Sequence, residues 1–491
     1  MRKFTILLAL SILSFSSKAQ IVTNYNPAIQ PTTGMQYFKP AEADLFTGDC
    51  MPAFHDGTYY LYWLLDQGHH AGLNGLGGHQ WALSTTKDLV NWQHHPIAVG
   101  IDEEWEKSIC TGSVIFEKDK VYAFYATRVK EGDRVYEQLS YAISEDGGFT
   151  FAKQQPNPFY YAPAECEPGH FRDPKVFKDD KGGFHLFVTA YKKNPVIKDM
   201  GGYLVHLVSD DLENWKEVAP VLDGQFTSPE CADYFLWNGW YYLIWSMGMG
   251  DTYYVKSRNP YGPWEYPDDQ ALLEPWSNVV KTAWFPGDRR IAASFIPYRE
   301  NDRTGTQWGG NVLLREVIQL KDGKLGTRFV EELLPQRQKR VNNLSPTFQP
   351  GACIRSANGG DITIEATDGV GAVTYENMPE KYRITMTITP HTNYHQLGLF
   401  LKATDQENGY MVELDADARK LKIENVQIEA LKGMNEPMTL DIIANGEYID
   451  VCYNGTRCNI NRLRDEKGNK MHLFVKNGSA TFSNVEIYEI E

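Results

Sequence analysis

The sequence lacks an excess of basic residues, and this absence narrows the range of possible partners. Lys and Arg total 48 against 63 Asp and Glu, so the formal net charge is −15. Because nucleic acids and anionic membranes attract basic surfaces, neither is an expected partner. The chain also has no Gly-x-Ser-x-Gly motif, no phosphate-binding loop and no dinucleotide fingerprint. Nothing therefore supports an esterase, a kinase or a dehydrogenase.

Long apolar runs are absent beyond the N-terminus. Arg2 and Lys3 precede an apolar stretch at residues 4–15, and Ala19 ends a segment that suits a signal peptidase. No stretch reaches the roughly 18 apolar residues of a membrane-spanning helix. Residues 1–19 are therefore predicted to be a signal peptide. Cleavage near Ala19 would leave an exported protein, periplasmic or extracellular, that does not insert into a membrane.

Cysteines are few and show no disulfide framework. The chain has 7, so at least one lacks a partner within the chain, and no Cys-x-x-Cys motif occurs. Export permits disulfides, but buried free thiols are the expected state of most of these residues. Cys452 and Cys458 form the one close pair whose bonding the sequence leaves open.

Aromatic residues, by contrast, make up 13% of the chain and recur in a repeating pattern. In four segments an aromatic-rich β run is followed by a polar turn that closes on an aromatic residue. The first strands of the repeating units begin at intervals of 54 to 62 residues, near Asp49, Thr111, Asp173, Glu230 and Trp284. Several strands per unit without a helical pattern are typical of β-propeller blades. Residues 20–336 are therefore predicted to form a five-bladed propeller, closed into a ring by both ends.

The pattern changes after residue 336. Residues 337–350 are polar and rich in turn-forming residues, which predicts a linker. Further on, Ile384, Met386 and Ile388 alternate with threonines, and similar short runs are separated by Gly, Asn and Asp. This alternation indicates an antiparallel β-sandwich over residues 351–491. The predicted fold is all-β, an N-terminal five-bladed propeller followed by a C-terminal antiparallel β-sandwich.

Three of the five predicted innermost strands begin with an acid, namely Asp49, Asp173 and Glu230. Because the first strand of each blade lines the propeller axis, these carboxylates are expected to converge in a central pocket. Like charges in a confined pocket raise each other's pKa, so one carboxyl stays protonated beside an ionised neighbour. Glycoside hydrolysis needs such a pair. A single acid at such a position has an ordinary explanation as a turn cap, but three favour catalysis.

The ordered set of motifs, one for each blade, resembles glycoside hydrolase family 32, the invertase, levanase and inulinase group. The resemblance covers about residues 40 to 335, and that family also carries a C-terminal sandwich. The matching motifs are Asp49 before His-Asp-Gly-Thr-Tyr-Tyr, Trp81 with Asp88-Leu-Val-Asn-Trp92, Thr111-Gly-Ser113, Arg172-Asp173-Pro174, Glu230-Cys231 and Trp308-Gly-Gly.

The resemblance implies a retaining glycosidase that hydrolyses O-glycosyl bonds in a fructan or another furanoside-containing oligo- or polysaccharide. It implies Asp49 as nucleophile, Glu230 as general acid/base and Asp173 as stabiliser of the transition state. The fork of donors on Arg172 suits neighbouring carboxylates and a sugar hydroxyl. The other substrate-binding candidates that the motifs give are Trp81, Ser113, Cys231 and Trp308.

Three positions depart from the family pattern. Gly48 replaces the Asn beside the nucleophile, Leu64 stands where a Gln is expected, and Cys110 where a Phe is expected. All three would touch the sugar, so the specificity for β-fructosides is left open. A family 43-like arabinosidase or xylosidase is one alternative, and a non-catalytic carbohydrate-binding propeller is another.

Three histidines, His69, His70 and His79, lie in or beside a Gly-rich loop. Their spacing matches no known set of metal ligands, so the loop is predicted to shape the mouth of the pocket. Neither a metal site nor a cofactor is expected.

Overall fold

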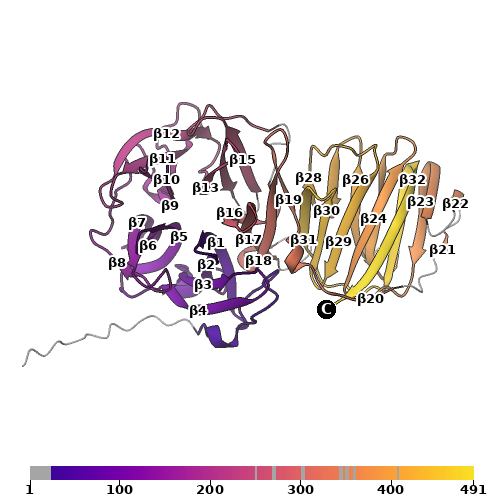
Figure 1. Ribbon diagram of the computed structural model, residues 1–491, viewed down its shortest axis with the longest axis horizontal. Coiled ribbons are helices and arrows are strands. Elements are labelled where there is room, and N and C mark those ends of the chain that lie inside the picture. The colour runs from indigo at the N-terminus through magenta and orange to yellow at the C-terminus, as the bar shows by residue number, and fades with distance from the viewer. Residues whose placement is uncertain are drawn as a thin grey trace, which may run out of the picture.

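The computed structural model describes residues 24–248, 251–267, 273–299, 305–341, 347–348, 353–357, 361–405 and 408–491. Two β-rich bodies lie side by side, a propeller and a sandwich (Figure 1). The predicted signal peptide, residues 1–19, lies outside the described residues. Among the residues that are described, no helix combines the length and the apolar character needed to cross a membrane.

Five antiparallel blades follow one another along the first part of the chain, which confirms the predicted propeller. Blade I contains β1 (Leu45–His55), β2 (Thr58–Gln67), β3 (Gln80–Thr86) and β4 (Trp92–Val99); blade II contains β5 (Glu106–Glu117), β6 (Lys120–Glu131), β7 (Arg134–Ser144) and β8 (Ala152–Lys153). Blade III contains β9 (Arg172–Lys178), β10 (Phe184–Tyr191), β11 (Gly202–Ser209) and β12 (Lys216–Gln225). Blade IV contains β13 (Glu230–Trp237), β14 (Trp240–Met247) and β15 (Asp251–Ser257); blade V contains β16 (Asn278–Phe285), β17 (Arg289–Arg299), β18 (Thr306–Gln319) and β19 (Leu325–Arg328). The described helices are short: η1 (Pro27–Ile29), α1 (Gly72–Gly75), η2 (Pro168–His170) and η3 (Glu331–Leu333).

The ring closes between blades I and V. The N–H of Tyr37 donates to the carbonyl of Val312 at 2.9 Å, and the N–H of Val312 donates to the carbonyl of Phe38 at 2.7 Å. Thr47 of β1 pairs with Gly310 of β18, so the two blades share one continuous sheet. The N-terminal lead therefore completes the propeller against its last blade, as the sequence predicted.

The aromatic strands pack the blades against one another. Along β2, Tyr59, Leu61 and Trp63 join a core cluster that includes Phe285 of blade V, whereas Tyr62 and Leu64 join a second cluster with blade II. Successive side chains of a strand point to opposite faces, so one strand fills both of its interfaces. This is why the β runs are aromatic on both faces rather than alternately polar.

The C-terminal body is a β-sandwich built around the long strand β32 (Lys470–Ile490), which pairs with β20, β23, β24 and β25. Its other strands are β20 (Arg337–Arg340), β21 (Thr347–Phe348), β22 (Cys353–Ala357), β23 (Asp361–Tyr375), β24 (Tyr382–Pro390), β25 (Gln396–Ala403), β26 (Tyr410–Asp415), β27 (Lys420–Ile423), β28 (Val426–Ile428), β29 (Met438–Asn445), β30 (Tyr448–Tyr453) and β31 (Arg457–Arg462). Ile384, Met386 and Ile388 are buried, as their alternation predicted. Because β20 belongs to this sheet, residues 337–340 of the predicted linker are part of the sandwich, whereas residues 342–346 and 349–350 lie outside the described residues.

A buried charge cluster joins the two bodies. Asp450 of β30 accepts a hydrogen bond from Arg315 of β18 at 2.7 Å and another from the hydroxyl of Tyr37 at 2.7 Å. Arg315 also pairs with Glu274 at 3.3 Å, and these three charged side chains are at most 2% exposed. An unpaired charge at this depth would be strongly unfavourable, so the contact fixes the sandwich against blade V.

Candidate active site

The innermost strand of every blade carries a β-bulge at the level where the candidate acids lie. The register shifts between Thr47 and Cys50 in β1, Ile109 and Gly112 in β5, Arg172 and Lys175 in β9, Glu230 and Asp233 in β13, and Asn278 and Lys281 in β16. A bulge bends its strand and redirects the side chains beside it. Five bulges around one axis therefore turn five short segments toward a common pocket.

In three of these bulges one residue other than glycine has a left-handed backbone conformation. Asp173, Cys231 and Val279 have φ of 54°, 55° and 56°. Such residues are strained by about 1–3 kcal/mol each, and they are common at functional sites. This pattern corrects the expectation that the acids begin their strands at equivalent positions. Asp173 is equivalent to Cys231, so Glu230 stands one residue earlier, at the position of Arg172.

A pocket of about 480 Å³ opens at this level of the propeller, and all five innermost strands contribute to it. It collects the three candidate acids together with Arg172, Cys231 and Trp308, as the motifs predicted. The full lining is Asp49, Leu64, His70, His79, Cys110, Thr111, Arg128, Glu137, Gly169, His170, Arg172, Asp173, Glu230, Cys231, Gly248, Asn278, Val279 and Trp308.

Asp49 lies at the base of the pocket with one carboxylate oxygen held and the other free of protein donors. Its Oδ2 accepts a hydrogen bond from the hydroxyl of Thr111 and lies 3.7 Å from the Sγ of Cys231. Its Oδ1 has no hydrogen-bond partner among the described residues. Burial raises the pKa of Asp49, while the Thr111 hydrogen bond and the nearby Lys281 act in the opposite direction. The arrangement holds Asp49 in one orientation.

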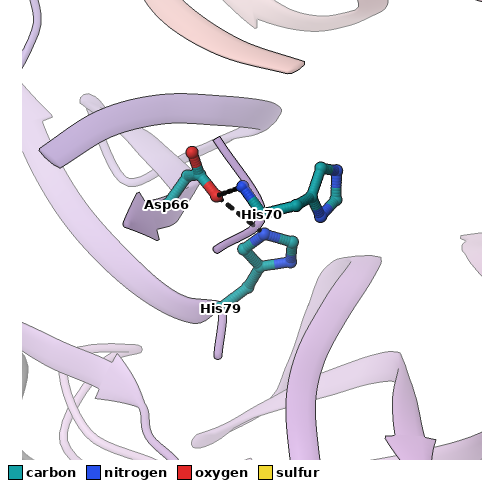
Figure 2. Close-up of side chains that lie close together, drawn as sticks. All are labelled: Asp66, His70 and His79. Carbon is teal, nitrogen blue, oxygen red and sulfur yellow. Dashed lines mark hydrogen bonds and ion pairs between the residues drawn. The ribbon is translucent and has the colours of Figure 1, made fainter. Parts of the chain in front are cut away.

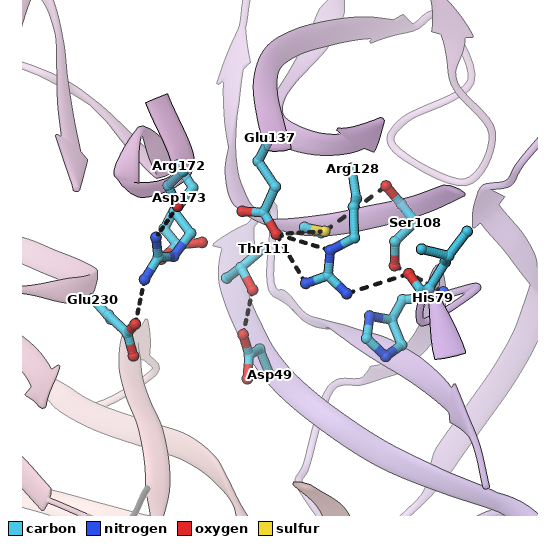
Figure 3. A network of polar contacts seen from close by, with 12 residues as sticks. Asp49, His79, Ser108, Thr111, Arg128, Glu137, Arg172, Asp173 and Glu230 are labelled. Atoms are coloured by element: carbon cyan, nitrogen blue, oxygen red, sulfur yellow. Dashed lines mark hydrogen bonds and ion pairs between the residues drawn. The ribbon is translucent and has the colours of Figure 1, made fainter. Parts of the chain in front are cut away.

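Asp173 and Glu230 share Arg172 (Figure 3). The two acids differ in exposure. Arg172 forms an ion pair with Glu230, and its Nε lies 3.6 Å from Oδ2 of Asp173. The Asp173 side chain is 5% exposed, whereas that of Glu230 is 33% exposed. Burial raises the pKa of Asp173 to about 7 against the attraction of Arg172, and Glu137, Glu230 and Asp49 add to the rise. The pocket therefore holds a carboxyl that keeps its proton close to neutral pH.

Trp308 can occupy its position only because residue 48 is a glycine. A Cβ atom at position 48 would overlap the six-membered part of the Trp308 ring. The residue change beside the nucleophile, which the sequence shows as the loss of an Asn, thus leaves the space that the indole fills. The rings of His70 and His79 pack on the same indole, with centroids 4.3 and 4.7 Å away.

We expect Gly48→Ala to lower kcat/KM about tenfold and to lower Tm. Because the methyl group would displace the Trp308 ring, the change overpacks the pocket wall, which costs about 1–3 kcal/mol. Steady-state kinetics and thermal denaturation measure the two effects. Gly183→Ala is the matched control, since a Cβ there meets the Asp179 side chain only at ordinary contact distances. Unchanged kinetics in Gly48→Ala would show that Trp308 does not depend on this glycine.

Two of the predicted substrate-binding residues lie behind the pocket rather than on its surface. Trp81 is fully buried, and its Nε1 donates to the carbonyl of Cys110 at 2.9 Å. The hydroxyl of Ser113 donates to the carbonyl of Pro174 at 2.8 Å and accepts from the N–H of Val176 at 2.8 Å. Both residues support the wall by joining a strand of one blade to that of the next. Met51 is also buried, with its sulfur 3.2 Å from the N–H of Gly112, so the apolar wall consists of Leu64 and Cys110.

The histidine loop forms one side of the pocket around the buried carboxylate of Asp66 (Figure 2). Asp66 accepts from the backbone N–H groups of His69 and His70, both at 2.9 Å, and pairs with Nε2 of His79 at 3.0 Å. His70 and His79 thus line the pocket, while a role of the loop in shaping the pocket mouth stays a prediction. Asp66, His70 and His79 offer ligand atoms within 4.8 Å of one another. The expectation of no metal here stays a prediction.

The sequence did not single out a charged pair on blade II that also lines the pocket. Arg128 of β6 and Glu137 of β7 are cross-strand neighbours, and Nη2 of Arg128 donates to Oε1 of Glu137 at 2.9 Å. The signal was present in the turn Glu131-Gly-Asp-Arg134, because a two-residue hairpin loop fixes the register and places residue 128 opposite residue 137. His170 and Asn278 were missed as well, with no comparable signal.

The six cysteines whose side chains the structure describes are all free and buried, in agreement with the sequence. Cys452 and Cys458 are directly opposite each other on β30 and β31, and both are free thiols here. Burial raises the pKa of Cys231, which contacts Asp49 through its sulfur and donates its N–H to Asp173 at 3.3 Å. Cys231 therefore links two of the candidate acids.

The fold is a five-bladed propeller, and three carboxylates meet in the pocket at its axis. Residues 50–273 match the model of the glycosyl hydrolases family 32 N-terminal domain. This part of the propeller is thus similar to a family 32 N-terminal domain, in agreement with the resemblance seen in the motifs.

Curated relatives and solved structures agree with this assignment. The chain is 29% identical to a levanase of Bacillus subtilis over 369 residues, which cover 67% of this chain and 50% of that one. It is 29% identical over 173 residues to a sucrose-6-phosphate hydrolase of the same organism, with 34% of each chain covered. The matched part thus spans between a third and a half of these relatives. Fructan 1-exohydrolase IIa from Cichorium intybus has a similar fold, with a TM-score of 0.69 and 15% identity over 94% of this chain and 98% of that one.

Proposed function

We propose that the protein is a retaining glycosidase that hydrolyses O-glycosyl bonds of a fructan or another furanoside-containing glycan. The observation that carries this proposal is the convergence of Asp49, Asp173 and Glu230 in one pocket of a family 32 propeller domain. A protein that only binds sugar has no need of three acids there. Two of them, Asp49 and Asp173, are buried, and burying a carboxylate is unfavourable because its charge loses hydration.

In the proposed reaction Asp49 attacks the anomeric carbon of the sugar. The hydrogen bond from Thr111 to Oδ2 holds the carboxylate in one orientation for this attack. Glu230 gives its proton to the leaving oxygen and then takes one from the incoming water. The greater exposure of Glu230 suits this role, because leaving group and water both arrive from the open side.

Asp173 and Arg172 prepare the site for the charge that develops. As a carboxylate, Asp173 accepts hydrogen bonds from ring hydroxyls as oxocarbenium character grows. Arg172 pairs with Glu230, and its remaining N–H donors suit a sugar hydroxyl beside the two acids. Export, which the signal peptide predicts, would bring the protein to glycans outside the cytoplasm.

Hydrolysis assays on sucrose, inulin, levan and an aryl-arabinofuranoside test the proposal. Release of fructose from at least one of the first three supports a β-fructosidase, whereas cleavage of the arabinofuranoside alone supports the family 43-like alternative. No hydrolysis of any of them would contradict the proposal.

We expect weak or no activity on sucrose and a higher kcat/KM on a longer glycan. Leu64 and Cys110 line the pocket without strong hydrogen-bonding groups, so a hydroxyl facing them goes unpaired. Such a loss amounts to roughly 1–3 kcal/mol, or about 10- to 100-fold in binding. A longer glycan compensates through contacts outside the first sugar. The measurement is kcat/KM on sucrose against levan and inulin oligosaccharides, and equal values would show that other residues restore the contact.

A further inference from the structure

A second cavity, of about 460 Å³, lies at the end of the propeller opposite the acids. The innermost strands β9, β13 and β16 begin at the pocket, and Phe177, Phe235 and Trp284 near their other ends line this cavity. Phe177 follows Asp173 by four residues and Phe235 follows Glu230 by five. Extended backbone therefore places these rings roughly 13 to 17 Å from the acids. The two cavities share no residue among those that the structure describes.

Aromatic rings form much of the wall of this second cavity, and part of the wall reaches the surface. The ring of Tyr234 is stacked with those of Tyr241 and Tyr261, with centroids 6.1 and 6.4 Å apart. Tyr261 is 39% exposed and Leu236 is 44% exposed, and both line the cavity. The hydroxyl of Tyr261 lies 3.4 Å from both ring nitrogens of His185, which fixes the ring. Exposed apolar side chains held around a cavity are typical of a binding site.

The charged groups of the lining balance one another. Asp179, Asp180 and Lys181 lie on the turn between β9 and β10 and line the cavity. Arg290 of β17 lines it as well, with its guanidinium 3.6 Å from the centroid of a ring in the wall. Lys178 is already in an ion pair with an acid outside the cavity. The lining thus offers two acids and two bases, which favours a neutral ligand over an anion or a cation.

The carboxylates of the turn lie close to the tyrosines of the wall. Burial raises the pKa of Tyr261 to about 12, and the charge of Asp179 adds to the rise. The hydroxyl of Tyr261 therefore stays protonated at neutral pH. Asp179 itself is held, because its Oδ1 accepts from the N–H groups of Lys181 and Gly183 at 3.0 and 2.8 Å. Aromatic faces and fixed polar groups thus meet in one cavity.

We propose that this cavity is a second sugar-binding site, which takes a neutral segment of the glycan that is cleaved at the acids. The C–H groups of a sugar ring pack on the electron-rich face of an aromatic ring such as Tyr261. Its hydroxyls donate to the carboxylates of Asp179 and Asp180 and accept from Lys181. A polysaccharide held here stays near the protein between cleavages, which raises its effective concentration at the pocket. The proposal rests on the proposed glycosidase function, because the ligand is the substrate.

Polysaccharide binding by a Glu230→Gln protein, which cleaves natural glycans slowly, tests the site. Affinity electrophoresis in gels that contain levan, inulin or arabinan gives the dissociation constants. Adding Tyr261→Ala should weaken binding of the preferred polysaccharide about tenfold, because an exposed ring face is lost. Adding Asp180→Ala instead should weaken it about threefold, through the loss of a hydrogen bond. Asp180 is exposed, so this second variant should fold even if the first does not.

Steady-state kinetics of the protein with an intact Glu230 give a second measurement. An activated aryl glycoside is too short to extend from the pocket to the far end of the propeller. Tyr261→Ala should therefore leave kcat/KM on the aryl glycoside unchanged and lower kcat/KM on the polysaccharide about tenfold, through a higher KM. A loss of stability alone would change both values by the same factor.

Tyr266→Ala is the matched control. Tyr266 belongs to the same segment after β15, is 54% exposed and does not line the cavity. This variant should match the parent in binding and in kinetics, and thermal denaturation checks that each variant is folded.

The outcomes separate the two proposals. Hydrolysis of a polysaccharide by the unchanged protein, with affinity and KM unaltered by Tyr261→Ala and Asp180→Ala, overturns the second site and leaves the glycosidase proposal standing. Binding that falls in both variants, without hydrolysis of any glycan, supports the site and contradicts the glycosidase. A parent that neither binds nor cleaves any of the three polysaccharides overturns both.

Discussion

Asp49→Asn should lower kcat at least about 10⁴-fold on every substrate, including those with good leaving groups. Without the carboxylate no covalent glycosyl-enzyme can form, and loss of a nucleophile has effects of this order. The amide keeps the shape of the side chain and its contact with Thr111, so binding and folding should change little. Stopped assays with inulin oligosaccharides and an activated aryl glycoside measure the loss.

Glu230→Gln provides the comparison within the same pocket. A good leaving group needs little protonation, so this variant should lose far more activity on a natural glycan than on the activated substrate. If both variants lose the same factor on both substrates, the roles assigned to Asp49 and Glu230 are incorrect.

Asp173→Asn should stabilise the protein at neutral pH while removing most of its activity. The pKa of Asp173 is about 7 in the folded protein against 3.8 for the free side chain. Well below pH 3.8 the group is protonated in both the folded and the unfolded state and has no effect on stability. As the pH rises to 7 the unfolded state ionises first, so the folded protein loses roughly 4 kcal/mol of stability. The variant lacks this loss.

Thermal denaturation from pH 4 to pH 8 measures this difference. The Tm of Asp173→Asn minus that of the unchanged protein should increase up to about pH 7 and then level off. A difference that stays constant with pH would mean that Asp173 is already ionised in the folded state. The activity loss, measured at pH 8 with a fructan substrate, distinguishes the required carboxylate from a merely destabilising one.

The blade architecture was predictable because the sequence of each repeat shows which residues pack between the blades. On β2 the alternation of Tyr59, Leu61 and Trp63 with Tyr62 and Leu64 fills two interfaces, and the polar turn that follows ends the unit. The repeat length then gives the number of blades. The start of the sandwich was less clear, because the Arg337–Arg340 strand is polar and exposed and its place depends only on backbone pairing with β32.

The candidate site was predictable in its acids but not in its register. The spacing of the repeats predicted that Asp49, Asp173 and Glu230 lie close together. The one-residue offset of Glu230, however, depends on the left-handed backbone of Asp173 and Cys231, which no side-chain pattern reveals. The motifs also predicted Trp81 as a sugar contact, whereas its indole is buried in the pocket wall and donates to the carbonyl of Cys110. Whether a residue faces the pocket or supports it is decided by the bulges.

The charge cluster around Asp450 has a consequence for domain recombination. Asp450 neutralises Arg315 of the last blade, while Tyr37 ties the same carboxylate to the segment that closes the ring. A propeller spliced to an unrelated sandwich would keep Arg315 buried with Glu274 as its only acid, and leaving a buried charge short of its partner is unfavourable by several kcal/mol. Chimeras should therefore accumulate as soluble protein only when the incoming module places a carboxylate at this point. The two halves of the chain therefore depend on each other for the balance of charge at their contact.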